Sequence, residues 1–99
     1  MADTLPRIGW DHESVRVFAP AKQWTVYFIR NWDGTLVYSG ATGEPRRRFH
    51  EELRDGFPGD YVELQKFRNA TAMAKAERVA ERGPWNLEKG KLNGAWGRR

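Results

Sequence analysis

The stretch WTVYFIRNWDGTLVYSG, residues 24–40, decides the expected fold. Its two ends are rich in β-branched and aromatic side chains, which favour strands. Asp33-Gly34 between them is typical of a hairpin turn. A hairpin loop with an even number of residues gives cross-strand partners of opposite number parity, so Tyr27 and Tyr38 should project from one face. A loop of four residues would pair these two tyrosines directly.

The remaining chain supplies a third strand and two helices. Pro45 suits the first turn of a helix, and Gly56 suits its end. Asn69 or Thr71 is suited to cap the second helix, which Gly83-Pro84 would close. The expected strands span 24–30, 35–38 and 61–67, and the expected helices span 44–54 and 70–82. We therefore expect an α/β domain of the α+β type, a three-stranded antiparallel sheet flanked by helices in the order β-β-α-β-α.

Two segments flank this core. Residues 1–22 are expected to form an N-terminal arm. The alternation in residues 14–18 indicates either an edge strand or an ordered arm packed by Trp10 and Phe18. Residues 87–99 form a basic tail that contains glycine and tryptophan, expected to fold over the core or over a ligand. With 99 residues, the chain has room for one domain with a small core.

Composition narrows the classes of function. The sequence has no cysteine, which excludes disulfides, thiolate zinc sites and a cysteine nucleophile. It has no apolar run near the roughly 18 residues that span a bilayer, and its first ten residues do not resemble a secretory signal. We expect a cytoplasmic protein, bacterial or phage-encoded and able to associate with the nucleoid. The net charge of +4 is compatible with a nucleic acid partner, because neutralised phosphates release counterions.

The two tyrosine motifs resemble those of the GIY-YIG nuclease superfamily. The Gly-Ile-Tyr half corresponds to Thr25-Val26-Tyr27, and the Tyr-Ile-Gly half corresponds to Tyr38-Ser39-Gly40. The separation of the tyrosines is similar to that in phage homing endonucleases of the family. Thr25, Val26 and Ser39 stand where the family has glycine, isoleucine and isoleucine.

The resemblance continues beyond the hairpin and covers residues 24–86. The family's helical arginine, which an aromatic residue follows, corresponds to Arg48. Its mid-helix glutamate corresponds to Glu77. Its closing asparagine corresponds to Asn86, with Asn93 as the second choice.

The resemblance implies a role for each of these residues. Tyr27 would activate water near a metal ion, which requires a nearby cation to lower its pKa from about 10. Tyr38 would hold the water or the phosphate. Arg48 would neutralise charge on the phosphoryl oxygens. Glu77 would hold Mg²⁺ or Mn²⁺ together with waters and a substrate phosphate. Asn86 would contact the phosphate or the leaving group.

Each residue also has a purely structural interpretation. The tyrosines can be half-buried strand residues with satisfied hydroxyls, and Asn86 can be a turn or cap residue. Glu77 can be solvated or paired with an arginine, and His50 can be a solvated helix residue rather than an auxiliary site residue. Two helical ion pairs at i, i+4 are possible, Arg48–Glu52 and Arg47–Glu51. Three tryptophans can stack on bases or belong to the core: Trp32, Trp85 and Trp96.

Basic residues lie on both sides of an acidic region. Those expected to contact phosphates are Arg46, Arg47, Lys89, Lys91, Arg98 and Arg99. The expected function is a metal-dependent endonuclease that cleaves DNA, with RNA as a second possible substrate and a protein partner as a possible source of specificity. The alternative is a catalytically weak or inactive GIY-YIG-like module that binds nucleic acid or a protein. A structural protein using the same fold is a third class.

Overall fold

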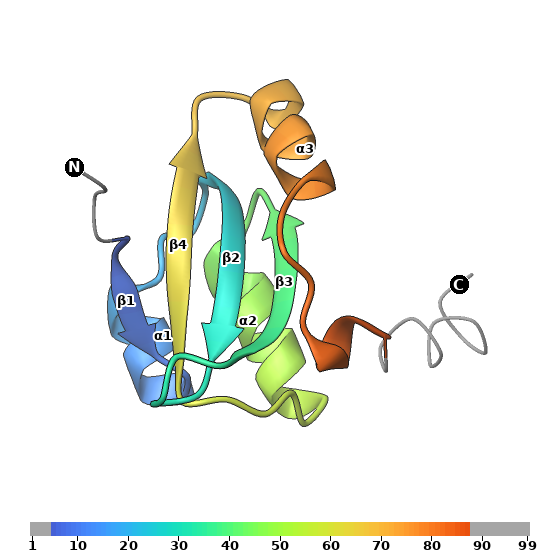
Figure 1. Ribbon diagram of the computed structural model, residues 1–99. Coiled ribbons are helices and arrows are strands. Elements are labelled where there is room, and N and C mark those ends of the chain that lie inside the picture. Colours follow the sequence, from blue (N-terminus) through green and yellow to red (C-terminus); the bar gives the residue numbers. More distant parts are fainter. Residues whose placement is uncertain (1–4, 88–99) are drawn as a thin grey trace.

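The computed structural model describes residues 5–87, which form a sheet, three helices and a helical turn at residues 84–87 (Figure 1). The expectation of a small α+β domain with an antiparallel sheet is confirmed. The elements are β1 (Arg7–Gly9), α1 (His12–Phe18), β2 (Trp24–Arg30), β3 (Leu36–Thr42), α2 (Pro45–Arg54), β4 (Tyr61–Phe67) and α3 (Ala70–Arg78).

The sheet has four strands rather than the three expected from the sequence. Their order is β1-β4-β2-β3, and all neighbours are antiparallel. The additional strand is β1, which lies in the expected arm and pairs Ile8 with Val62 of β4. Three residues are too few for a sequence pattern to reveal a strand. They form one here because the outer edge of β4 offers unpaired backbone groups.

The segment around residues 14–18 is a helix, so the expected edge strand is wrong. The Asp11 carboxylate accepts a hydrogen bond from the Ser14 backbone N–H at 2.7 Å, which caps the first turn of α1. This local cap prevails over the short period-two alternation. Trp10 is buried as expected for the arm, whereas Phe18 is exposed.

The β2–β3 hairpin places Tyr27 and Tyr38 on one face but does not pair them directly. Tyr27 lies opposite Gly40, and Tyr38 lies opposite Ile29. A register shift between Ile29 and Arg30 accompanies a loop longer than four residues. The shared face is therefore confirmed, and the direct pairing is wrong.

The two helices that follow differ in how well the sequence predicted them. Helix α2 spans Pro45–Arg54, close to expectation, and Gly56 has a φ of 86° just after it, which glycine adopts without strain. Helix α3 begins as expected, with the Asn69 side chain accepting from the Ala72 N–H. It ends at Arg78 rather than at Arg82.

The core lies between the sheet and the pair α1 and α2, which pack against each other on one face (Figure 1). Phe49 of α2 is fully buried and packs edge-on against Trp10 and Tyr27. Helix α3 contacts β2, β3 and β4, and it lies near the end of the sheet where β2 begins. None of the helices within residues 5–87 is long and apolar enough to cross a bilayer.

A histidine pair joins α1 to α2. The Nδ1 atoms of His12 and His50 are 2.7 Å apart, and the rings stack with centroids 4.9 Å apart. One ring must donate and the other accept, so at least one is neutral. Burial, followed by the charges of His12, Arg54 and Arg46, lowers the pKa of His50 from its usual 6.5. His50 therefore holds the α1–α2 contact rather than lying free in solvent.

Acidification is expected to weaken this contact. The folded-state pKa of His50 lies below its unfolded value, so the unfolded chain binds more protons at pH values around and between these two pKa values. Stability should be fully present above the unfolded pKa and should fall as the pH drops through the folded one. Urea midpoints measured from about pH 8 to about pH 5 check this, and His50→Gln should flatten the decline. A decline that is equally steep in His50→Gln would contradict the assignment.

Candidate active site

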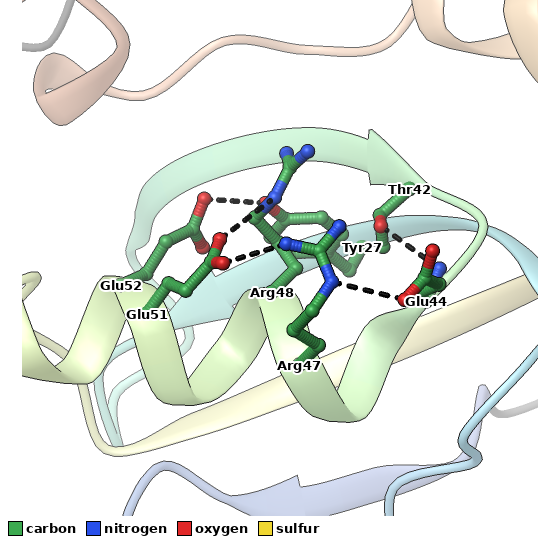
Figure 2. A network of polar contacts seen from close by, with 7 residues as sticks. All are labelled: Tyr27, Thr42, Glu44, Arg47, Arg48, Glu51 and Glu52. Atoms are coloured by element: carbon green, nitrogen blue, oxygen red, sulfur yellow. Dashed lines mark hydrogen bonds and ion pairs between the residues drawn. The ribbon is translucent and has the colours of Figure 1, made fainter.

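A buried hydrogen bond between Tyr27 and Glu52 lies at the centre of the candidate site. Tyr27 projects from β2 toward α2, and both side chains are almost completely buried. The Tyr27 hydroxyl donates to Glu52 Oε2 at 2.7 Å (Figure 2). A hydroxyl bonded to an ionised acceptor forms one of the stronger kinds of hydrogen bond in a protein.

Tyr38 lies beside Tyr27 on the same face of the sheet. The ring centroids are 6.1 Å apart, and Tyr38 also packs edge-on against Phe57. Gly40 makes this proximity possible, since a Cβ there would come within 2.7 Å of the Tyr27 hydroxyl and 2.9 Å of the Tyr38 ring. A glycine in the second tyrosine motif is thus required by packing.

Arg48 brings a guanidinium to the two phenols from α2. Its side chain is about one-third exposed, and its Nε lies 3.8 Å from Glu51 Oε1. Figure 2 shows it projecting from the helix above Tyr27. Burial lowers the pKa of Arg48, but Tyr27 and Glu52 outweigh burial and raise it. Arg48 is therefore a permanent cation at the tyrosine cluster.

Both phenols have raised pKa values, whereas the role that the resemblance implies for Tyr27 needs a lowered pKa. Burial, and then the charge of Glu52, raises the pKa of Tyr27 well above 10. Burial and Glu52 also raise the pKa of Tyr38, to about 12, although Arg48 and Tyr27 oppose the rise. The cation needed near Tyr27 is present, yet its effect is smaller than the effects of burial and the adjacent carboxylate.

Glu77 of α3 acts on this cluster from a separate element. Its charge helps to raise the pKa of Tyr38, after burial and Glu52, so the carboxylate lies within electrostatic range of this phenol. Its side chain is half-buried and makes no hydrogen bond or ion pair with any residue from 5 to 87. These properties leave its oxygens available to a metal ion. No group of three or more metal-binding side chains occurs in that range.

The Asn86 side chain forms hydrogen bonds with backbone groups of two segments. Its Oδ1 accepts from the N–H groups of Ser39 and Gly83 at 2.9 and 2.8 Å, and its Nδ2 donates to the Ser39 carbonyl at 2.7 Å. These bonds fasten the segment after α3 along the outer edge of β3 (Figure 1). The observed contacts are those of the structural interpretation, and they bring Asn86 next to the second tyrosine motif.

The basic residues near the start of α2 already have protein partners. Arg46 Nε donates to the Ala19 carbonyl at 2.9 Å and anchors the α1–β2 connection. Arg47 bonds to Glu44 at 2.9 Å and to Glu51 at 2.6 Å (Figure 2). The i, i+4 pair of Arg47 with Glu51 is thus confirmed, and Arg48 also forms an ion pair with Glu51.

Two tryptophans that were candidates for base stacking are placed differently. Trp85 packs against Phe57 at the edge of the core. Trp32 is 75% exposed and stacks on Tyr61 at the hairpin loop. The remaining candidates lie outside the described residues: Lys89, Lys91, Asn93, Trp96, Arg98 and Arg99.

Glu52 is the site residue that sequence reasoning missed. The sequence indicates Glu52 only as an i, i+4 partner of Arg48, yet its side chain is 1% exposed. One sequence signal was available, because Pro45, Phe49 and Glu52 share one face of a helix and all three are buried. A carboxylate on an apolar helix face indicates a buried partner, which here is Tyr27.

Comparisons with other proteins do not identify this chain. No protein-family model, no curated protein and no solved structure matched it.

The Tyr27–Glu52 bond predicts a specific loss of stability. Tyr27→Phe removes the Tyr27 hydroxyl while keeping the ring, so the buried Glu52 carboxylate loses a hydrogen-bond donor. The expected cost is about 1.5–3 kcal/mol in the free energy of unfolding, measured by urea denaturation. Tyr61→Phe is the matched control, because Tyr61 is also buried but its hydroxyl bonds to nothing within residues 5–87. Equal effects of the two substitutions would contradict the assigned role.

Proposed function

We propose that this protein is a metal-dependent endonuclease that cleaves phosphodiester bonds of DNA. The observation that carries the proposal is the meeting of Tyr38, Arg48 and Tyr27 at one place, with the charge of Glu77 acting on Tyr38. These residues come from β2, β3, α2 and α3, so their meeting does not follow from closeness in the sequence.

Arg48 and Tyr38, the partly exposed members of this cluster, are suited to bind the scissile phosphate of the substrate and the attacking water. Arg48 is permanently charged and partly exposed, so its planar fork can bind the phosphoryl oxygens as negative charge develops on them. Tyr38 is slightly exposed and can orient the attacking water by hydrogen bond. Both phenols are protonated at neutral pH, because their pKa values are raised. Neither is therefore the final acceptor of the proton from water.

Glu52 is the better proton acceptor. If Tyr38 takes a proton from the attacking water as it passes its own hydroxyl proton to Tyr27, the Tyr27 hydroxyl proton can pass to Glu52 over the existing 2.7 Å hydrogen bond. Tyr27 then remains neutral throughout, and Glu52 changes from carboxylate to carboxylic acid. Such a relay agrees with the burial of Tyr27, since it needs no direct contact between Tyr27 and bulk water.

The donor set fits a Mg²⁺ or Mn²⁺ ion. Mg²⁺ prefers oxygen ligands and usually retains several waters, so one or two carboxylates together with substrate phosphate are sufficient. Glu77 provides such a carboxylate and has no competing partner within residues 5–87. A bound ion would polarise the phosphate and lower the pKa of its bound water.

A nucleic-acid-binding module without cleavage is the second candidate. The full burial of Tyr27 and its bond to Glu52 favour it, because they keep this phenol away from a substrate. Such a module would retain Arg48 and the other basic residues as phosphate contacts. A protein partner could supply specificity in either case.

Plasmid nicking tests the proposal directly. The purified protein should convert supercoiled DNA to the open circle in Mg²⁺ or Mn²⁺, and EDTA should abolish the conversion. Binding to a labelled duplex, measured by fluorescence anisotropy across salt concentrations, separates the nuclease from the module that binds without cleavage. Binding without nicking would favour the module, and the absence of both would reject the nucleic acid assignment.

A further inference from the structure

A pocket of about 580 Å³ lies at the end of the sheet where β2 begins and where β3 and β4 end. Its walls come from the segment that enters β2, the β3–α2 connection, α2 itself and the end of β4. Small-molecule sites commonly have volumes of roughly 300–1,000 Å³. Arg48 belongs both to this pocket and to the tyrosine cluster, so the pocket adjoins the candidate active site.

The pocket carries an excess of positive charge. Its lining includes one carboxylate, Glu44, and four basic side chains: Lys22, Arg47, Arg48 and Arg68. Glu44 is already bonded to Arg47. Neither Lys22 nor Arg68 forms an ion pair within residues 5–87. Lys22 acts on Glu44 only through its charge, so two cations that form no ion pair within residues 5–87, in a pocket with two more, favour an anionic ligand.

The pocket also presents a flat aromatic surface. Trp24 is 41% exposed although it belongs to β2. Its indole lies against Gly43, where an added Cβ would approach the ring to 2.7 Å. The ring is therefore supported by backbone while part of it remains open. Phe67 of β4, which pairs with Trp24 of β2 in the sheet, lines the same pocket.

We propose that this pocket binds one nucleotide of a single-stranded nucleic acid, with its base stacked on Trp24 and its phosphate held by Arg68 and Lys22. Stacking on an aromatic ring combined with a basic groove is the usual way in which single strands are bound. A base inside an intact duplex would first have to leave its stack, which costs energy. The expected ligand is therefore a single-stranded or frayed segment.

The proposal rests on the proposed nuclease function in one respect only. A nucleotide in the pocket would bring a neighbouring phosphate to Arg48, which lies between the pocket and the tyrosines. Binding in the pocket itself requires neither metal nor cleavage, so it can be tested separately.

The test measures the affinity for a labelled single-stranded oligonucleotide by fluorescence anisotropy, in EDTA and across salt concentrations. Trp24→Leu should weaken binding roughly 5- to 150-fold without changing the salt dependence, since stacking is worth that much per base. Arg68→Gln should reduce the log–log salt slope by about 0.7, the value for one phosphate contact on a single strand. A duplex of the same length should bind more weakly than the single strand.

Two matched controls accompany these variants. Trp32→Leu removes a more exposed tryptophan at the hairpin loop, and Arg54→Gln removes an exposed arginine at the other end of α2. Both should bind like the unmodified protein. Because Arg68 is exposed, Arg68→Gln decides the matter if Trp24→Leu does not fold. The proposal is overturned if Arg68→Gln leaves the salt slope unchanged, or if folded Trp24→Leu binds as tightly as Trp32→Leu.

The outcomes separate this proposal from the nuclease assignment. Weakened binding in Trp24→Leu and Arg68→Gln without plasmid nicking by the unmodified protein would retain the pocket and reject the nuclease. Nicking by the unmodified protein, together with unchanged binding in both variants, would retain the nuclease and reject the pocket.

Discussion

Replacing Glu77 with glutamine is expected to abolish metal-dependent nicking. The amide keeps the size of the side chain but removes the negative charge that would hold the cation. A metal ion contributes several kcal/mol of charge stabilisation in such reactions, so nicking should fall by roughly 10²- to 10³-fold or more. Timed conversion of supercoiled plasmid in Mg²⁺ measures this loss.

The fold and the affinity for nucleic acid should survive this substitution. Glu77 is only half-buried and makes no side-chain bond within residues 5–87, so the glutamine leaves no group of that range without a partner. Glu81→Gln is the matched control, since Glu81 is an exposed glutamate four residues further along the chain, just beyond the end of α3. Nicking that persists in both Glu77→Gln and EDTA would refute a metal held by Glu77.

Truncating Phe49 to alanine is expected to cause a large loss of stability. Phe49 is completely buried, and its ring packs edge-on at 5.6 Å from Trp10 and 4.9 Å from Tyr27. Removing a buried phenylalanine ring typically costs about 3–5 kcal/mol in the free energy of unfolding. A domain of this size has a total stability of about 5–15 kcal/mol, so much of it would be lost.

Phe18→Ala provides the matched control for Phe49→Ala. Phe18 is 69% exposed on α1, so its truncation should change stability by no more than about 0.5 kcal/mol. Urea denaturation of the two variants and the unmodified protein compares them. Similar losses in both would mean that Phe49 is not the centre of the core. Since Phe49 also supports the Tyr27 ring, activity should fall together with stability.

The sequence predicted the elements whose signals are local. The β-rich composition of β2 and β4, Pro45 and Gly56 around α2, and the Asn69 cap of α3 each depend on a few neighbouring residues. The shared face of Tyr27 and Tyr38 followed from strand periodicity, which the register shift near the loop did not alter.

The sequence did not predict features that depend on distant partners. Strand β1 exists because β4 offers it an edge, and Asn86 bonds to Ser39 across the chain. The exposure of Trp24 beside Arg68 likewise requires β2 and α2 to meet the end of β4. Each of these contacts joins elements that are far apart in the chain.

Glu52 shows most clearly where the sequence and the tertiary structure divide. By itself the sequence determined that two tyrosines share a face and that an arginine follows on the next helix, because strand and helix periods are properties of the local backbone. Only the tertiary structure decided that Glu52 turns inward, that it accepts from Tyr27, and that both phenols hold their protons more tightly than usual. The physical reason is that burial and charge proximity, which set pKa values, arise only when distant elements pack together.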